Sequence, residues 1–134
     1  MDFVVLIGRI LFVFVFLGSG MAHLTQTEGM AGYAQSKGVP FAKPTVLGSG
    51  ALIIVGALMV LLGIWGDLGA LFIVLFLVPT ALMMHNFWQE TDAQAKQLEM
   101  IQFMKDIGLA GGALTMFALY AEGQVGWAIT DPLF

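Results

Sequence analysis

The sequence predicts an all-α protein of the membrane-spanning class: a four-transmembrane-helix bundle that runs up-down-up-down with short connecting loops. The composition supports this prediction, because 59% of the 134 residues are hydrophobic and only 10% are charged, whereas an average soluble domain has about 25% charged residues. The apolar residues also gather in runs of about 20, the length that a helix needs to cross a hydrocarbon core of roughly 30 Å. Four such runs leave room only for short loops, so residues 1–134 are expected to form a single domain.

The first predicted span covers residues 3–25 and is dense in Phe, Val, Leu and Ile. A signal peptide explains this segment less well, because Asp2 stands where a basic cluster is expected and Arg9 interrupts the apolar run. Two interpretations of Arg9 stay open. In the first, the long side chain of Arg9 extends along the helix so that its guanidinium reaches the nearby interface. In the second, Arg9 is a buried cation that faces the interior of the bundle. Arg9, Phe16 and His23 are seven residues apart and therefore share one helical face.

The second and third predicted spans cover residues 45–65 and 68–88, and a tight turn at Gly66-Asp67 joins them. The second span carries no charge and contains several glycines, which let membrane helices approach one another closely. Pro79 predicts a kink in the third span, because proline removes one backbone donor and clashes with the preceding turn.

Two longer polar stretches separate the spans. Residues 26–44 are expected to form a loop, with a turn signal at Gly38-Val39-Pro40. Residues 90–106 are compatible with an interfacial helix, capped by Thr91 or Asp92, or with a solvated loop. The fourth predicted span covers residues 103–121. Its strictly apolar part is short, so it spans only where Lys105 and Asp106 lie at the interface or where the bilayer thins locally.

Charge and residue content exclude several functions. The net charge of −4 offers no electrostatic footprint for nucleic acid. The absence of Cys excludes disulfides, thiol nucleophiles and thiolate metal sites. We recognise no Ser-His-Asp set, glycine-rich phosphate loop, carboxylate cluster or metal site, so the catalytic residues are unknown. All four lysines belong to the two longer polar stretches, which the positive-inside rule places in the cytoplasm.

The candidate cofactor-binding residues are His23, His85, Asn86, Trp88 and Arg9. His23 ends the first predicted span and His85 ends the third, and alternate spans of an up-and-down bundle run parallel, so both imidazoles should lie at the same membrane face. Three interpretations compete. These side chains hydrate the helix ends, or they bind the head group of a quinone or another isoprenoid-like ligand, or the two histidines hold haem iron as axial ligands. Haem is disfavoured, because nothing else marks a haem crevice.

Several short motifs follow one another along nearly the whole chain. They are Arg9, Gly18-Ser19-Gly20, His23, Gly38-Val39-Pro40, Gly56 to Gly63, His85-Asn86-Phe87-Trp88 and the tail GQVGWAITD, which ends at Asp131. Their order and spacing resemble the DoxX family of small bacterial membrane proteins. The resemblance implies a four-span bundle in the bacterial cytoplasmic (inner) membrane and a link to membrane redox chemistry. Members of this family often carry a Glu in the second span, shortly before the glycine that matches Gly56. This sequence departs from the family there, because residues 49–53 contain no acidic residue.

The expected function is that of a DoxX-like membrane protein associated with redox chemistry. It would be a quinone- or lipid-like-ligand-binding subunit of a membrane oxidoreductase assembly, without established activity of its own. The alternative is a non-catalytic membrane scaffold or accessory subunit of a larger complex, docked through its glycine-lined helices. The expected partners are the lipid bilayer and either a protein in a membrane complex or further copies of the chain. A small transporter is less favoured, because the spans contain so few ionisable residues.

Overall fold

A computed structural model describes all of residues 1–134 and is entirely helical. It contains five α-helices and one short 3₁₀ helix. These are α1 (Asp2–Thr25), α2 (Thr27–Ser36), α3 (Ala42–Leu62), α4 (Gly66–Met84), η1 (Phe87–Gln89) and α5 (Ala93–Ala121).

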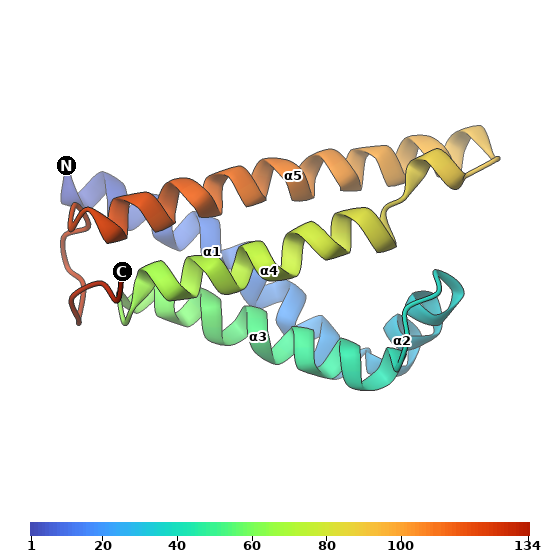
Figure 1. Ribbon diagram of the computed structural model, residues 1–134, viewed down its shortest axis with the longest axis horizontal. Helices are drawn as coiled ribbons and strands as arrows, with labels where there is room; N and C mark the ends of the chain where they lie inside the picture. Colours follow the sequence, from blue (N-terminus) through green and yellow to red (C-terminus); the bar gives the residue numbers. More distant parts are fainter.

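The four long helices α1, α3, α4 and α5 lie along one axis, and successive long helices run in opposite directions (Figure 1). Both chain termini lie at one end of this arrangement, and α2 and the turn between α4 and α5 lie at the other (Figure 1). We call the first the terminal end and the second the α2 end. Three segments are long and apolar enough to cross a membrane: Asp2–Thr25, Ala42–Leu62 and Gly66–Gln89.

Helix α5 differs from the predicted fourth span. It begins at Ala93, ten residues before the predicted start at residue 103, so the polar stretch and the apolar stretch form one helix of 29 residues. Strong helix formers fill residues 93–107 without a Gly or Pro to interrupt them,. The carboxylate of Asp92 caps the helix by accepting a hydrogen bond from the backbone N–H of Ala95 at 2.9 Å,. The charged first half keeps α5 out of the set of helices that qualify as spans by length and composition.

The stretch predicted as a loop over residues 26–44 contains the ten-residue helix α2. Two small side chains, Ala31 and Ala34, are buried against Val46 at the start of α3. This packing stabilises a helix that is too short to be stable alone. The turn signal at Gly38-Val39-Pro40 does follow the end of α2, and Gly38 adopts a positive φ of 81° there.

Helix α4 ends at Met84, earlier than the predicted limit at residue 88, although it continues through Pro79. His85 is the C-cap residue, and Phe87 to Gln89 form the separate 3₁₀ helix η1. Residues 86–88, predicted as the end of the third span, therefore do not continue helix α4.

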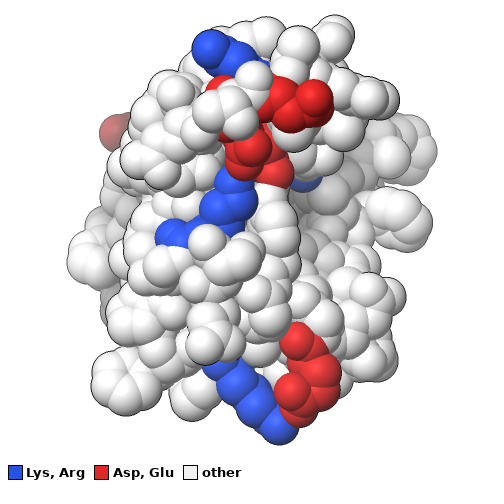
Figure 2. All heavy atoms as spheres, turned by 90° about the vertical axis from the view of Figure 1, so that its right-hand side faces the viewer, with Lys and Arg blue, Asp and Glu red and all other residues white.

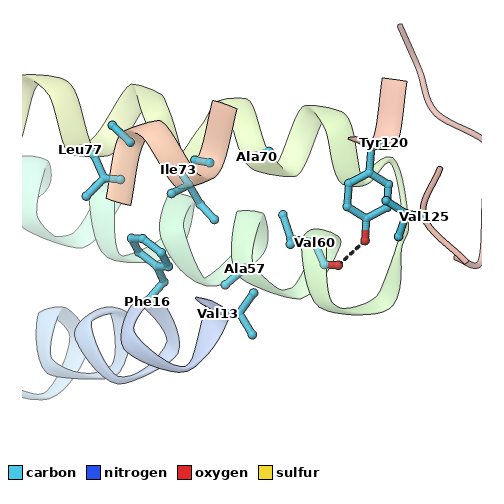
Figure 3. Packing of buried hydrophobic residues seen from close by; sticks show 11 residues of the cluster. Val13, Phe16, Ala57, Val60, Ala70, Ile73, Leu77, Tyr120 and Val125 are labelled. Atoms are coloured by element: carbon cyan, nitrogen blue, oxygen red, sulfur yellow. Dashed lines mark hydrogen bonds between the residues drawn. The ribbon is translucent and has the colours of Figure 1, made fainter. Parts of the chain in front are cut away.

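One hydrophobic core joins the four long helices. Val13 and Phe16 of α1 pack with residues of α3, α4 and α5, and Tyr120 closes the core near the terminal end by donating to the carbonyl of Val60 at 2.5 Å (Figure 3). Helices α3 and α4 are in close contact because each has a glycine at the point where they cross. A Cβ atom on Gly56 would lie 2.9 Å from the carbonyl oxygen of Gly69. The outward-facing side chains are large and apolar, as in Leu11 and Phe14, which suits contact with lipid,.

Candidate functional site

A cavity of about 610 Å³ lies toward the α2 end and is lined by residues from α1, α2, α3, α4 and α5. Its volume falls within the range of about 300–1,000 Å³ that is typical of small-molecule sites. Much of the wall is apolar, with Leu52, Leu75, Phe76, Met83 and Met84 among the lining side chains. The structure brings both histidines of the chain, His23 and His85, to this one cavity.

His23 is buried near the end of α1 and is held in a single orientation. Its Nδ1 lies 2.7 Å from the backbone oxygen of Ser19, one helical turn earlier. Its ring packs edge to face against Phe76, with 5.7 Å between the ring centroids. The close approach of α1 and α3 depends on Gly50, where a Cβ atom would lie 2.5 Å from the Cβ of His23. The backbone therefore fixes the position of this imidazole in the wall.

His85 belongs to a chain of hydrogen bonds that links α2, α4 and α5. Its Nδ1 lies 2.7 Å from Oε2 of Glu99, and the hydroxyl of Tyr33 donates to the other oxygen of the same carboxylate. On the opposite side of the ring, Nε2 lies 3.7 Å from Oδ2 of Asp106. Glu99 and Asp106 are seven residues apart, so they lie on one face of α5 and approach the imidazole from two sides.

The hydrogen bonds in this chain shift two pKa values in opposite directions. Burial raises the pKa of the Tyr33 hydroxyl, and the hydrogen bond to Glu99 and its negative charge raise it further. Burial alone would raise the pKa of the Glu99 carboxyl, but the hydrogen bonds from Tyr33 and His85, with the charges of His85 and Lys37, outweigh it. The pKa of Glu99 therefore lies below its usual value, which keeps this carboxylate ionised,.

Asp106 is the polar residue of the cavity that the sequence did not single out. It lines the cavity and is only 4% exposed, and its Oδ2 atom has no hydrogen-bond partner in the protein. The Nζ atom of Lys105 lies 3.8 Å from its other oxygen, Oδ1. In the sequence, both residues mattered only as the charged start of the fourth span, which crosses if they lie at the interface or if the bilayer thins locally. The seven-residue spacing from Glu99 was the available signal, but it has meaning only once residues 90–106 are known to be helical.

Asn86 and Trp88 were candidate site residues, and the structure places both outside the lining of the cavity. Asn86 accepts a hydrogen bond from Nζ of Lys37 at 3.1 Å, and the same ammonium forms an ion pair with Glu90 at 2.9 Å. Trp88 is half exposed and packs edge to face against Phe103, in the first half of α5. These residues therefore hold the turn between α4 and α5 against the rest of the α2 end.

Figure 2 looks onto the α2 end and shows acidic and basic side chains next to one another on an otherwise uncharged surface. The pairs include Lys37 with Glu90 and the exposed pair of Lys43 with Glu28. We find no group of three or more His, Cys, Asp or Glu side chains that could hold a metal ion.

Arg9, the fifth candidate site residue, lies near the terminal end and does not reach the cavity. It is buried, as one of the two interpretations held, but its partners are backbone carbonyls. Its Nε donates to Val60 at 3.1 Å, Nη1 donates to Gly126 at 3.0 Å, and Nη2 donates to Leu61. Val60 and Leu61 lie in the last turn of α3, where the backbone carbonyls lack partners within the helix and the helix dipole favours a cation. Arg9 therefore joins α1, the end of α3 and the C-terminal tail.

Comparison with known proteins places the chain in a family. The sequence model of the DoxX family matches residues 4–86, which include α1, α3 and α4. The inner membrane protein YphA of Escherichia coli (strain K12) is 26% identical over 120 residues, which are 90% of this chain and 84% of that protein. No solved structure matches the chain. Because the family match covers more than half of a chain with three apolar helices of membrane-spanning length, this protein is an integral membrane protein that belongs to the DoxX family.

Proposed function

We propose that this protein binds a quinone or a similar lipid-like ligand in the cavity at the α2 end and acts as a subunit of a membrane oxidoreductase assembly. The observation that carries the proposal is a cavity of about 610 Å³ with two imidazoles in a mostly apolar wall. An apolar pocket with a few convergent polar groups is the usual form of a small-molecule site.

The wall provides separate surroundings for the two parts of such a ligand. Leu52, Leu75 and Phe76 come from the middle of α3 and α4 and would contact an isoprenoid or acyl tail. His23, His85 and Asp106 would contact the polar head group. Since the protein contains no Cys, any electron transfer would use the bound ligand and a partner protein.

We further propose that α5 is the fourth span, over residues 103–121, which gives an up-down-up-down bundle in the bacterial inner membrane. YphA, named as an inner membrane protein, supports this location. Lys37 directly follows α2, the other three lysines belong to α5 or the start of α3, and the one arginine is buried. The positive-inside rule then places the α2 end in the cytoplasm.

The orientation can be tested by single cysteine labelling, since the chain has no Cys of its own. Q94C and Q124C place exposed thiols at the two ends of α5. A membrane-impermeant maleimide added to intact spheroplasts should label Q124C, and it should label Q94C only after lysis. Labelling of both variants in intact spheroplasts would contradict a fourth span.

Ligand binding can be tested with protein in lipid nanodiscs and decylubiquinone, offered in its oxidised and in its reduced form. We expect saturable binding of at least one form, and a fall in the affinity for that form of about tenfold for H85A or H23A, the effect of losing one good hydrogen bond in a buried site. Q124A, at the terminal end, is the control and should bind as the wild-type protein does. Absence of saturable binding, or equal binding by both histidine variants and wild type, would refute the proposal.

One observation favours the scaffold alternative. Gly108 and Gly111 are exposed on α5, and nothing lies within 4 Å of a Cβ atom at either position. Small residues on an outer helix face let a second membrane helix approach. G111L should then break co-purification with a partner without lowering the thermal stability of the isolated protein, whereas H85A should leave the complex intact.

A further inference from the structure

We propose that the cavity selects the reduced, hydroxyl-bearing form of its ligand, a quinol rather than a quinone. The inference rests on the proposed function of the cavity and deepens it by naming the redox state that the cavity holds. Its basis is that the polar atoms free to contact a ligand are mostly hydrogen-bond acceptors.

The two imidazoles are fixed as acceptors by what their other nitrogen contacts. Nδ1 of His23 lies 2.7 Å from the backbone oxygen of Ser19, which can only accept, so Nδ1 carries the hydrogen. Nδ1 of His85 lies 2.7 Å from the carboxylate of Glu99 and carries the hydrogen for the same reason. A neutral imidazole has one N–H. In the neutral state of each ring, Nε2 is therefore a lone-pair acceptor.

Asp106 adds a third acceptor. Its Oδ2 atom is buried and has no hydrogen-bond partner in the protein. The charged groups that face it are His85, with Nε2 at 3.7 Å, and Lys105, with Nζ at 3.8 Å from Oδ1. Both distances exceed that of a hydrogen bond. If His85 gains a second proton, its Nε2 becomes a donor, but the Asp106 carboxylate still offers an acceptor to a ligand.

The hydroxyl groups of the wall are mostly engaged as donors elsewhere. Five lining side chains carry a hydroxyl: Ser19, Tyr33, Thr45, Ser49 and Thr80. Tyr33 donates to Glu99. Three more donate to backbone carbonyls: Thr45 to Pro40 at 3.0 Å, Ser49 to Val46 at 3.1 Å, and Thr80 to Phe76 at 2.7 Å. Because a hydroxyl has one hydrogen, these four present only lone pairs to the cavity.

The remaining donors are few. They are the hydroxyl of Ser19, the amide of the exposed Gln26 and the ammonium of Lys105, whose side chain is 49% exposed and already donates to Gln102. A quinone oxygen is an acceptor and would leave the carboxylate of Asp106 unpaired. A quinol hydroxyl is a donor, and it satisfies that carboxylate or the Nε2 of His23. Since leaving a buried polar group unpaired is costly, the wall matches the quinol.

The test compares both redox forms of decylubiquinone, under anaerobic conditions, with the protein in nanodiscs. We expect the wild-type protein to bind the quinol about tenfold more tightly than the quinone, because a site built to bond a hydroxyl rejects the analogue without it. D106N replaces one acceptor by an NH₂ donor of the same size and should remove or reverse this preference. D131N, in the tail at the terminal end, is the matched control and should keep it.

A second measurement needs no variant and covers the case in which D106N does not fold. The dimethyl ether of the quinol keeps its ring, tail and oxygen atoms but carries a methyl group in place of each hydroxyl hydrogen, so it has no donor and should bind the wild-type protein no more tightly than the quinone does. Equal affinity for quinol and quinone, tighter binding of the quinone, or undiminished binding of the dimethyl ether would overturn the inference while leaving the proposed function standing. Failure of every form to bind would refute the proposed function and this inference together.

Discussion

Replacing Arg9 by Met is expected to release the C-terminal tail from the end of α3 while leaving the cavity at the α2 end unchanged. Methionine keeps much of the apolar length of the side chain, so the change removes mainly the guanidinium. Besides its bonds to α3 and to Gly126, Arg9 lies 3.4 Å from the carbonyl oxygen of Trp127. The substitution thus removes the donors that tie the tail to two helices.

The magnitude follows from the acceptors that are left behind. The carbonyls of Gly126 and Trp127 can turn to water once the tail moves, but those of Val60 and Leu61 belong to the end of α3. Val60 keeps the hydroxyl of Tyr120 as a donor. Each buried acceptor that loses its partner costs about 1–3 kcal/mol, and relief from burying a charge offsets part of this. Leu61 is thus the one acceptor left without a donor, and we expect the free energy of unfolding to fall by about 1–3 kcal/mol.

Hydrogen exchange of the tail amides in nanodiscs measures this effect directly. The amides of Ile129 and Thr130 donate to the carbonyl of Gly63 at 3.0 Å, so they report whether the tail is docked. Their exchange should accelerate by up to about 5- to 160-fold, the factor that 1–3 kcal/mol corresponds to. R9K keeps the charge but not the planar set of donors and should give an intermediate value. If the tail amides of R9M exchange as slowly as those of the wild-type protein, and R9M binds the ligand more weakly, then Arg9 serves the cavity and the role assigned to it in the tail is wrong.

Three further outcomes are expected. G56L should push α3 away from Gly69 of α4 and lower the free energy of unfolding by about 1–3 kcal/mol or more. G48L is the control, because Gly48 faces open space, and it should leave stability unchanged. Thermal unfolding in detergent compares the two variants. Because the folded-state pKa of Glu99 is lowered, its contribution to holding α2 is fully present above the unfolded pKa of about 4.3 and is lost as the pH falls through the folded value. The protection factors of the α2 amides, which correct for the intrinsic pH dependence of exchange, should fall accordingly between pH 6 and pH 3, and constant protection factors would contradict a role of Glu99 in holding α2. Y33F removes one bond that lowers this pKa, so the same loss of protection should begin at a higher pH.

The helices that the sequence predicted well are the uniformly apolar ones. Segments such as residues 45–65 leave little choice, because a backbone in lipid must satisfy its own hydrogen bonds within a helix. The sequence predicted a loop where α2 forms and left a helix or a loop open for the first half of α5, because both stretches are polar and have no long apolar run. Their structure depends on tertiary contacts, such as Ala34 against Val46, and tertiary contacts override the local pattern.

The candidate site was partly predictable for the same reason. Counting spans is enough to bring His23 and His85 to one end of the bundle, because each histidine follows an apolar run of membrane-spanning length and the two runs are parallel. The partners of His85 could not be found in this way, because Glu99 and Asp106 face it only if α5 begins near residue 93. Arg9 was recognised as buried or interfacial, but its partners are carbonyls of α3 and of a tail that folds back across it, and no spacing rule predicts that contact.

The two buried carboxylates of the chain indicate how its two ends differ. Asp67, at the start of α4, accepts hydrogen bonds at Oδ2 from the backbone N–H groups of Leu133 and Phe134 at 2.6 and 2.7 Å, so the tail satisfies this oxygen, although its Oδ1 has no hydrogen-bond partner. Asp106, at the α2 end, has its nearest charged neighbours at 3.7 and 3.8 Å and no hydrogen bond from the chain to its Oδ2. A buried carboxylate without a donor is costly, and Asp106 lines a cavity large enough for a ligand. The tail thus supplies two donors to the buried carboxylate of the terminal end, whereas the chain supplies no hydrogen bond to Oδ2 of Asp106, the atom that a ligand donor would satisfy in the proposed site.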